Sequence, residues 1–364
     1  MKKIEVELKD NPYEIYYGSG CFKEINKLIK SKNLPSNVFV VIDSKFYAKW
    51  KTTIVKNLDG KFPKFDFIQI NAGEKNKSLK TLEKILQKLI KGNYSRDTLL
   101  ISIGGGIVGD IAGFAAAVFS RGIKYIQVPT TLLATVDSAI GGKTGVNLEH
   151  TKNIVGSIYQ PDFVLIDTDF LKTLPRNEIL CGTGEIIKYA YLTNEKFYTY
   201  VLKNMDKIFS LNKKVIEEVI SECVNYKGSI VANDEKEKGL RKVLNLGHTF
   251  AHGIEVEQDH KIKHGEAVVI GLASALYLSN KVGLLKDERL KRYSLLISKF
   301  KNEIKISRYN KHKIYGIMQR DKKNRNNKIK FVLLKKAGEI VLDFEADRKL
   351  VFESIEYGLN LFSR

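Results

Sequence analysis

A group of histidines has the residue type and spacing of a metal site. Four of the six histidines fall between positions 248 and 264. In LNLGHTFAHGIE, His248 and His252 are four residues apart and share one helical face, and His264 begins the next apolar segment, KHGEAVVIG. Two imidazoles one turn apart, with a third from a neighbouring helix, suit Zn²⁺ or a similar ion. The pair alone also fits an incidental or purely structural use.

An anionic oxygen ligand for such an ion is available in the segment GTGEIIKYAYL. Glu185 lies among apolar residues, with Lys188 one turn further on the same side. One interpretation is an ordinary ion pair on a helix surface. The surrounding apolar residues indicate a partly buried helix, however, and a buried carboxylate requires a partner because burying it alone is costly. Glu185 is therefore a candidate metal ligand.

A glycine-rich turn in TLLISIGGGIVGDIAGF is typical of a phosphate-binding site. The apolar run 99–103 predicts a buried strand, and 107–119 predicts a helix. Between them, backbone amides at the helix start can bind an anion, because glycines leave its approach open. A tight connection that needs glycine for its conformation is the simpler alternative. The glycines are Gly104, Gly105, Gly106 and Gly109.

The turn departs from the ordinary dinucleotide fingerprint in one respect. That fingerprint lies in the first βαβ unit and is followed about 20 residues later by an acidic side chain. Here Arg121 and Lys124 stand in the corresponding place. An earlier residue must then hold the ribose of any bound dinucleotide.

Polar residues inside apolar segments add further candidate contacts. In VPTTLLATVDSAIGGKTGVN, Thr130 and Thr131 could bind a pyrophosphate or an amide. Asp137 could accept from a sugar hydroxyl, and Lys143 could bind an anion. Each of these alone also fits a surface or turn position, and their density is what favours a site. More cations and amides follow at Lys152, Asn153, Arg241 and Asn245.

The elements that must position these residues change in type along the chain. Strand-like runs occur at 4–8, 38–43, 67–71, 99–103, 125–128 and 163–167. Helical patterns such as 79–91 separate them, and this alternation predicts a parallel sheet with helices on both faces. Helical spacing then dominates at 178–192, 195–209, 213–233, 246–257, 264–282 and 286–301, and strands return only at KIKFVLL and GEIVLDF.

These patterns predict two domains. We expect a Rossmann-like α/β domain over residues 1–175 and a mainly α-helical domain over 176–364. Ligand pockets often form between domains, so we expect the site in the cleft.

Composition indicates a globular protein. The chain has 364 residues, of which 43% are hydrophobic, and no apolar run reaches membrane-spanning length. The start, MKKIEVEL, predicts a strand and has no signal-peptide core, so we expect a cytoplasmic protein. The three cysteines are far apart, form no C-x-x-C motif and fit reduced structural thiols.

The net charge of +20 attracts phosphates in general. Nucleic acid is therefore an alternative partner. The lysines are spread along the chain, with no dense basic arm and no interleaved aromatic residues, which favours solvated faces and small phosphorylated ligands instead.

Taken together, the motifs resemble those of the 3-dehydroquinate synthases, a family of sugar-phosphate cyclases. The resemblance spans residues 43–334, in the family's order. It rests on GGGIVGDIAGF, QVPTTLLATVDSAIGGKTGVN, KNIVGSIYQP, GEIIKYA, LNLGHTFAHGIE, HGEAV, and DKK before FVLL. One departure is Gly184, where the family usually has alanine before the glutamate.

The resemblance implies a two-domain NAD-dependent lyase of the shikimate pathway, which leads to chorismate and aromatic amino acids. Such an enzyme converts 3-deoxy-D-arabino-heptulosonate 7-phosphate to 3-dehydroquinate and phosphate. The reaction oxidises one carbon with NAD⁺, eliminates phosphate, returns the hydride and closes the ring by an aldol step. Zn²⁺ is the implied metal, with Co²⁺ as the alternative, and a homodimer is implied.

The resemblance also implies roles for individual residues. The metal ligands would be Glu185, His248 and His264, and His252 would relay protons. NAD would contact Asp43, Glu74, Lys77, Gly105, Gly106, Gly109, Asp110, Thr130, Thr131, Lys143 and Lys152. The substrate would contact Asp137, Lys143, Lys152, Asn153, Lys188, Lys227, Arg241, Asn245 and Lys322 or its neighbour Lys323, and Arg121 would reach the phosphate bound by the other subunit.

Three alternatives remain at this point. A sibling sugar-phosphate cyclase would act on another sugar phosphate, and a metal-dependent polyol dehydrogenase would release NADH. A basic nucleic-acid-binding protein would bind DNA in a salt-sensitive way and contain no metal.

Overall fold

The computed structural model describes residues 1–149, 151–320 and 328–363. They form two compact units. The first contains Met1–Pro175 and Ile216–Lys236, and the second contains Arg176–Val215 and Glu237–Arg364. Residues 216–236 pack with the first unit, although the sequence placed them in the second domain. The division into domains at residues 175 and 176 remains a proposal.

A seven-stranded sheet forms the centre of the first unit, in the order β1-β2-β9-β6-β5-β3-β4. Only β1 is antiparallel to its neighbour, and the other pairs are parallel. The central strands are buried on both faces, which explains their continuous apolar sequences. The strands are β1 (Lys2–Val6), β2 (Tyr13–Gly18), β3 (Asn37–Asp43), β4 (Lys64–Ile70), β5 (Leu99–Gly104), β6 (Lys124–Pro129) and β9 (Phe163–Asp167).

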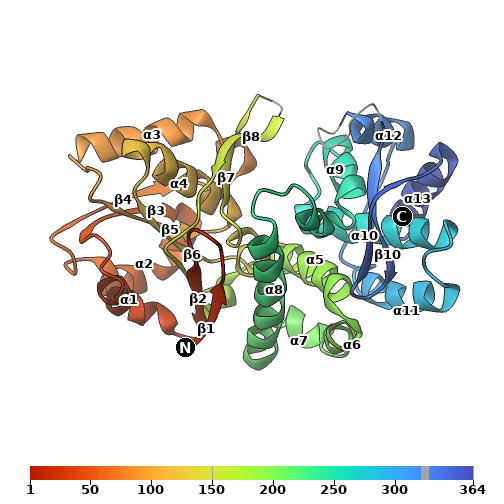
Figure 1. Ribbon diagram of the computed structural model, residues 1–364, viewed down its shortest axis with the longest axis horizontal. Helices are drawn as coiled ribbons and strands as arrows, with labels where there is room; N and C mark the ends of the chain where they lie inside the picture. The colour runs from red at the N-terminus through yellow and green to blue at the C-terminus, as the bar shows by residue number, and fades with distance from the viewer. Residues whose placement is uncertain (150, 321–327, 364) are drawn as a thin grey trace. The chain divides into compact units, whose positions relative to one another are not determined.

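Helices cover both faces of this sheet, as Figure 1 shows. Successive strand residues point to opposite faces. Val40 therefore packs in one core with Phe46 of α2, while Val41 packs in another with Ile85 of α3 and Ile111 of α4. The first face has α1 (Ile25–Ser31) and α2 (Ser44–Leu58), and the second has α3 (Leu79–Lys91) and α4 (Gly106–Val118). The unit also contains the hairpin β7 (Lys143–Leu148) and β8 (Thr151–Ile158), and most of α8 (Lys213–Asn233).

The strand order places a topological switch point between β3 and β5. The chain leaves β3 into α2 on one face and leaves β5 into α4 on the other. Ligands of open parallel sheets bind outside the carboxyl ends of the strands at such a point. Asp43 ends β3 and the glycine turn follows β5, so both lie at this edge.

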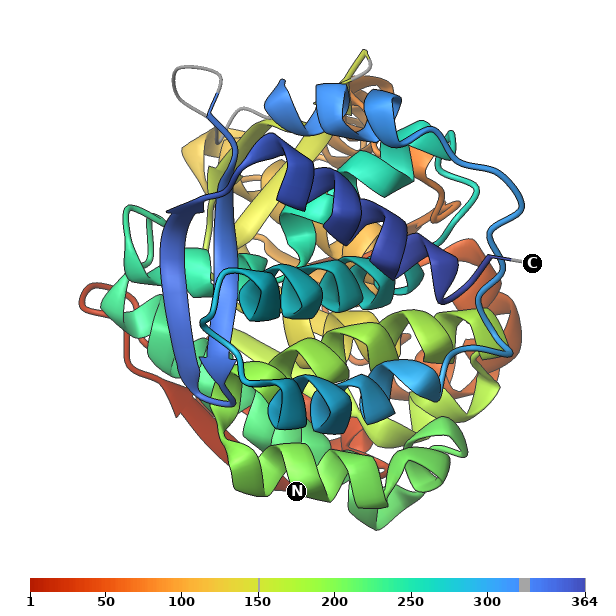
Figure 2. The same cartoon turned by 90° about the vertical axis from the view of Figure 1, so that its right-hand side faces the viewer.

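The second unit is built around α10 (His264–Lys281), which contacts α5, α9, α11, α13 and β10. Figure 2 shows α10 in the middle of this unit, beside the β10–β11 hairpin. The helix is apolar on nearly all sides, as a central helix must be. The other elements are α5 (Arg176–Thr193), α6 (Glu195–Lys203), α7 (Met205–Phe209), α9 (His248–Glu257), α11 (Asp287–Ser298), α12 (Lys311–Gln319), α13 (Arg348–Asn360), β10 (Lys330–Lys336) and β11 (Glu339–Glu345).

The fold class predicted from the sequence is confirmed, with local differences. The predicted helix 195–209 is divided into α6 and α7 at Asn204, whose side-chain amide donates to the carbonyl of Tyr200 at 2.9 Å. Such local bonds compete with helix continuation. Among the described helices, none combines the length and hydropathy that a bilayer crossing demands.

Candidate functional site

Three helices of the second unit bring Glu185, His248 and His264 together. Their ligand atoms all lie within 4.8 Å of one another. Nε2 of His264 lies 3.2 Å and Nε2 of His248 lies 3.5 Å from Oε1 of Glu185. Two ligands of a tetrahedral zinc ion are about 3.3 Å apart at usual bond lengths. The two histidine–glutamate distances are therefore close to the spacing of ligands to one ion.

Close approach of the helix backbones makes this convergence possible. A Cβ at Gly184 of α5 would lie 2.8 Å from the carbonyl carbon of Gly265 in α10. A Cβ at Gly271 would lie 2.9 Å from the backbone nitrogen of Ala251 in α9. Because glycine has no Cβ, the backbones of α5 and α9 can each lie directly against that of α10 at these two crossings. The departure at Gly184 is thus part of how this chain packs its ligand helices.

The orientation of each candidate histidine ring is fixed by a contact to its Nδ1 atom. Nδ1 of His248 lies 3.2 Å from the carbonyl oxygen of Leu246. Nδ1 of His264 lies 3.4 Å from Oε1 of Glu255, which is 5% exposed. With Nδ1 directed at an acceptor, Nε2 of each ring is left for a metal. The sequence interpretation missed Glu255, although it lies seven residues after His248 on the same face of α9.

The charges around Glu185 support a cation site. Glu185 is fully buried, and neither carboxylate oxygen accepts a well-formed hydrogen bond from the described residues. Oε2 lies 2.5 Å from Nζ of Lys188, itself 1% exposed, which leaves Oε1 to face the two histidines. Burial alone would raise the pKa of Glu185, but Lys188 and the imidazoles hold it well below its ordinary value.

The two imidazoles have opposite pKa shifts. Burial, together with the Lys188 ammonium, lowers the pKa of His248 to about 4. Burial also opposes charge on His264, but the carboxylates of Glu185 and Glu255 outweigh it and raise its pKa to about 10. The cluster therefore favours a positive charge beside the carboxylate of Glu185, on the side of His264. One carboxylate and two imidazoles, with both oxygens lacking good hydrogen bonds, fit a divalent metal ion.

Of the other predicted residues of the second unit, His252 lies beside this cluster. The ring centroid of His252 is 5.6 Å from that of His248 and 6.3 Å from that of His264. Arg241 is buried in the 3-10 helix Leu240–Asn245, and the amide of Asn245 donates to Glu237 at 3.0 Å. Lys322, with Lys323, lies outside the described residues.

In the first unit, the predicted cofactor residues gather at the switch point. Asp43 ends β3 and caps α2, because its carboxylate accepts from the amide of Phe46 at 2.8 Å. Thr130 follows β6, and its amide donates to the carbonyl of Gly104 at 2.9 Å. Thr131 lies against Gly105, where a Cβ would be 2.9 Å from its methyl group. The glycine turn therefore also serves close packing, in addition to leaving amides accessible.

A polar network connects further predicted residues of this unit. Lys77 is buried, and its Nζ lies 2.5 Å from the carboxylate of Asp110 and also donates to the side chain of Asn153. Burial raises the pKa of Asp110, and Lys77 opposes that rise. Asn147, missed in the sequence, bonds to Glu74 and Asn153. Asn153, expected among the substrate contacts, thus lies in one network with Lys77 and Asp110, which were expected to contact the cofactor.

The remaining predicted residues of the first unit lie on three segments. Asp137, in the short π-helix Ala134–Ser138, accepts from Nζ of Lys227 through both its backbone and side-chain oxygens. Lys143 begins β7 and Lys152 lies on β8. Arg121 is exposed and has a positive φ of 64° in the turn after α4.

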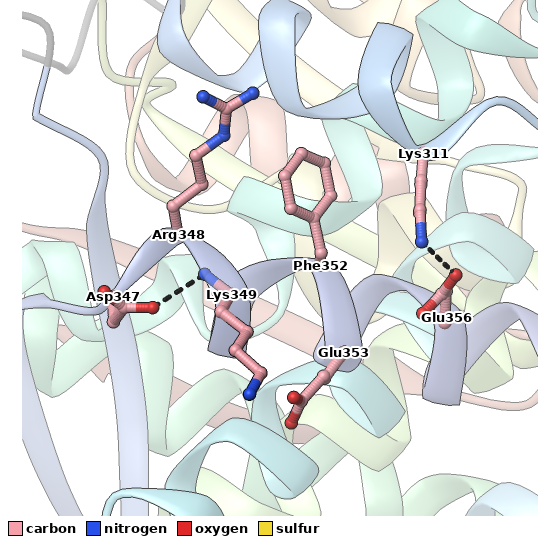
Figure 3. Close-up of a pocket in the computed structure, with 7 residues that line it drawn as sticks. All are labelled: Lys311, Asp347, Arg348, Lys349, Phe352, Glu353 and Glu356. Atoms are coloured by element: carbon pink, nitrogen blue, oxygen red, sulfur yellow. Dashed lines mark hydrogen bonds and ion pairs between the residues drawn. The ribbon is translucent and has the colours of Figure 1, made fainter.

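A surface pocket of about 490 Å³ has none of the predicted residues, as Figure 3 shows. It lies between α12 and the start of α13. Several of its charged side chains already have partners: Lys311 pairs with Glu356, and the carboxylate of Asp347 caps α13 by accepting from the amide of Lys349 at 2.8 Å. We therefore assign the candidate chemistry to the two groups above, where buried charges converge.

Comparison with known proteins gives a consistent result. Family models described as "3-dehydroquinate synthase N-terminal" and "3-dehydroquinate synthase C-terminal" match residues 67–181 and 182–324. A 3-dehydroquinate synthase from Pelagibacter ubique is 39% identical, with 96% of each chain covered. One from Dictyoglomus thermophilum is 36% identical, with 98% of this chain and 99% of the other covered.

Solved structures show the same fold. A 2-deoxy-scyllo-inosose synthase, complexed with carbaglucose-6-phosphate, NAD⁺ and Co²⁺, aligns with a TM-score of 0.89 at 25% identity, covering 97% of this chain and 99% of the other. A Streptomyces hygroscopicus 2-epi-5-epi-valiolone synthase, with NAD⁺ and Zn²⁺ bound, has a TM-score of 0.86 at 23% identity, with 98% of each covered. A Schizosaccharomyces pombe glycerol dehydrogenase reaches 0.66 at 16%, covering 95% of this chain and 89% of the other.

Proposed function

This chain belongs to the 3-dehydroquinate synthase family, and on that premise we propose that it converts 3-deoxy-D-arabino-heptulosonate 7-phosphate to 3-dehydroquinate and phosphate. The observation that carries the proposal is the convergence of Glu185, His248 and His264 within 4.8 Å. The activity would place the protein in the shikimate pathway.

We propose that these three residues hold Zn²⁺, with Co²⁺ as the alternative. Two imidazole nitrogens and one carboxylate oxygen are a frequent ligand set of catalytic zinc. When bound, the ion would supply Lewis acidity toward substrate hydroxyls. The residues themselves present Nε2 of both rings and Oε1 of Glu185 to one point, while Lys188 neutralises Oε2.

The group at the switch point would hold NAD. The cofactor would supply a hydride acceptor and donor that is regenerated in each turnover. Asp43 would accept from a ribose hydroxyl, and its position at the end of the strand beside the glycine turn supports this role. The amides at the start of α4 have no side-chain cap, so they can bind a pyrophosphate.

The chain's own cations would orient the sugar phosphate. A dianionic phosphate and a carboxylate are best held by preorganised positive charge, which also stabilises the leaving group. We propose this role for Lys143, Lys152, Lys188, Lys227 and Arg241, with Asp137 and Asn245 binding hydroxyls. His252, beside the two ligand rings, would relay protons. Lys322 remains a candidate outside the described residues.

We also propose a cytoplasmic homodimer in which Arg121 reaches the phosphate bound by the other subunit. Exposed apolar side chains on α4 and the β7–β8 hairpin support an interface on this part of the first unit. They are Val118, Leu148, Ile154 and Ile158.

Phosphate release from the heptulosonate phosphate tests the proposed function. We expect release that requires NAD⁺, stops with a chelator and returns with Zn²⁺ or Co²⁺, without steady accumulation of NADH. A stoichiometric rise in NADH with a polyol and no phosphate release would indicate a dehydrogenase instead. Release that is insensitive to exhaustive chelation would contradict the metal site.

A further inference from the structure

Asn147, near the end of β7, makes three hydrogen bonds to residues of the proposed site. Its side-chain amide donates to Oε1 of Glu74 at 2.8 Å, and its Oδ1 accepts from the backbone amide of Asn153 at 2.9 Å. Its own backbone amide donates to the carbonyl of Lys77 at 2.8 Å. One residue thus uses a donor, an acceptor and its main chain on three different partners.

These partners come from two separate segments of the first unit. Glu74 and Lys77 belong to the turn between β4 and α3, and Asn153 belongs to β8. Lys77 strengthens the connection, because its ammonium bonds both Asp110 on α4 and the side chain of Asn153. Without the Asn147 side chain, one described hydrogen bond would still join the turn at residues 74–77 to Asn153. That bond runs from the ammonium of Lys77 to the side chain of Asn153.

The bond from Asn147 stabilises an unusual backbone conformation at Asn153. Asn153 has a φ of 52°, in the left-handed region that costs most residues energy. A hydrogen bond to its amide holds that conformation and so fixes the direction of its side chain. The neighbouring Lys152 is held by the same stretch of backbone.

We propose that Asn147 is a positioning residue. It couples the turn at residues 74–77, which would contact NAD, to Asn153 of β8, which would contact substrate. The inference rests on the proposed function and on the contacts that the family resemblance implies, in which Glu74 and Lys77 contact NAD and Asn153 contacts substrate. Its direct consequence is that the geometry of the turn at residues 74–77 depends on the side chain of Asn147, which is not among the residues expected to contact NAD or substrate.

Two substitutions separate the two side-chain bonds. Asn147→Ala removes both. Asn147→Asp keeps an acceptor for the amide of Asn153 but places a carboxylate against Glu74, where like charges repel. The matched control is Asn37→Ala, which removes another asparagine bond of the first unit, to the carbonyl of Asp97 at 3.1 Å.

The experiment measures NAD⁺ binding by titration calorimetry on the full chain, and hydrogen exchange of the amides at 151–155. We expect Asn147→Ala to weaken NAD⁺ binding about 10-fold, the equivalent of one or two hydrogen bonds, and to speed exchange at 153. Asn147→Asp should weaken NAD⁺ binding at least as much, with exchange close to that of the unmodified protein. Metal content should be unchanged throughout.

Glu74→Gln in the Asn147→Asp background provides a rescue. Its amide can donate to the new carboxylate, so NAD⁺ affinity should return to that of Glu74→Gln alone. Affinity within twofold of the unmodified protein in Asn147→Ala would overturn the inference, as would a parallel loss of metal, which indicates a general loss of structure. If the unmodified protein binds no NAD⁺, the proposed function fails instead.

Discussion

The backbone contact between α5 and α10 predicts a large effect of one methyl group. A Cβ at Gly265 would lie 2.6 Å from both Cα and the carbonyl carbon of Cys181. Ordinary contacts begin at 3.4 Å, so Gly265→Ala must separate the helices by at least 0.8 Å, the difference between those distances. The obstacle is backbone, which cannot rotate away as a side chain can.

The same separation acts on the proposed metal ligands. His264 precedes Gly265, and Glu185 lies one turn after Cys181 on α5. Their ligand atoms, now 3.2 Å apart, would be about 4.0 Å apart. Zinc bonds of about 2.0 to 2.1 Å could then span the gap only in a nearly straight line, which excludes tetrahedral binding.

We therefore expect Gly265→Ala to weaken zinc binding by more than about 100-fold, the upper range for losing an outer partner. Overpacking should also destabilise the protein by about 1–3 kcal/mol. Chelator competition measures the first and thermal unfolding the second. The control is Gly316→Ala on α12, where the nearest atom to a Cβ, 3.9 Å away, belongs to the flexible side chain of Arg320. Zinc affinity in Gly265→Ala within threefold of the unmodified protein would refute the reasoning.

Three other measurements test parts of the structure. Asp43→Ala should lower the free energy of unfolding by about 1 kcal/mol, because the cap on α2 is lost, and should also weaken NAD⁺ binding. Asp43→Ser should keep the cap and weaken only NAD⁺ binding. Calorimetry of NAD⁺ binding and thermal melts show whether the two effects separate. Burial raises the thiol pKa of Cys21 and of Cys181 to about 12, so Ellman's reagent at pH 8 should react slowly with both until the protein unfolds, and rapid labelling would contradict their burial. Burial raises the pKa of Tyr94 to about 12, so the stability that its neutral hydroxyl contributes is present below pH 10 and lost between pH 10 and 12. In denaturant titrations, Tyr94→Phe should therefore lose less stability over that range than the unmodified protein. The same pH profile in both proteins would contradict this prediction.

Several predictions from the sequence depended on local signals. The alternation of apolar runs and helical spacing indicated the sheet and the helical second half, because burial requires those periods. The ligand candidates were found because histidine and glutamate are unusual in apolar helices. The β7–β8 hairpin was not predicted, since its apolar residues are few and mostly exposed or half-buried. The helices α12 and α13 were not predicted either, although they bury Ile314, Met318, Val351, Ile355 and Leu359.

The residues missed in the site share a different property. Glu255 and Asn147 act through other residues, and their partners are settled by packing. Glu255 had a signal in its spacing from His248. Asn147 had none without knowledge that β7 returns toward the turn at Glu74.

The sequence alone determined which chemistry is available: a carboxylate and imidazoles for a metal ion, a glycine turn for an anion, and helices and strands of a two-part α/β protein. These follow from residue type and period, which are local quantities. Only the tertiary structure decided that Oε1 of Glu185 faces both histidines, that Lys188 occupies Oε2, and that Asn153 lies beside Lys77. Those outcomes depend on backbone approaches between distant segments, such as the one that Gly184 and Gly265 permit, and no local pattern encodes such a distance.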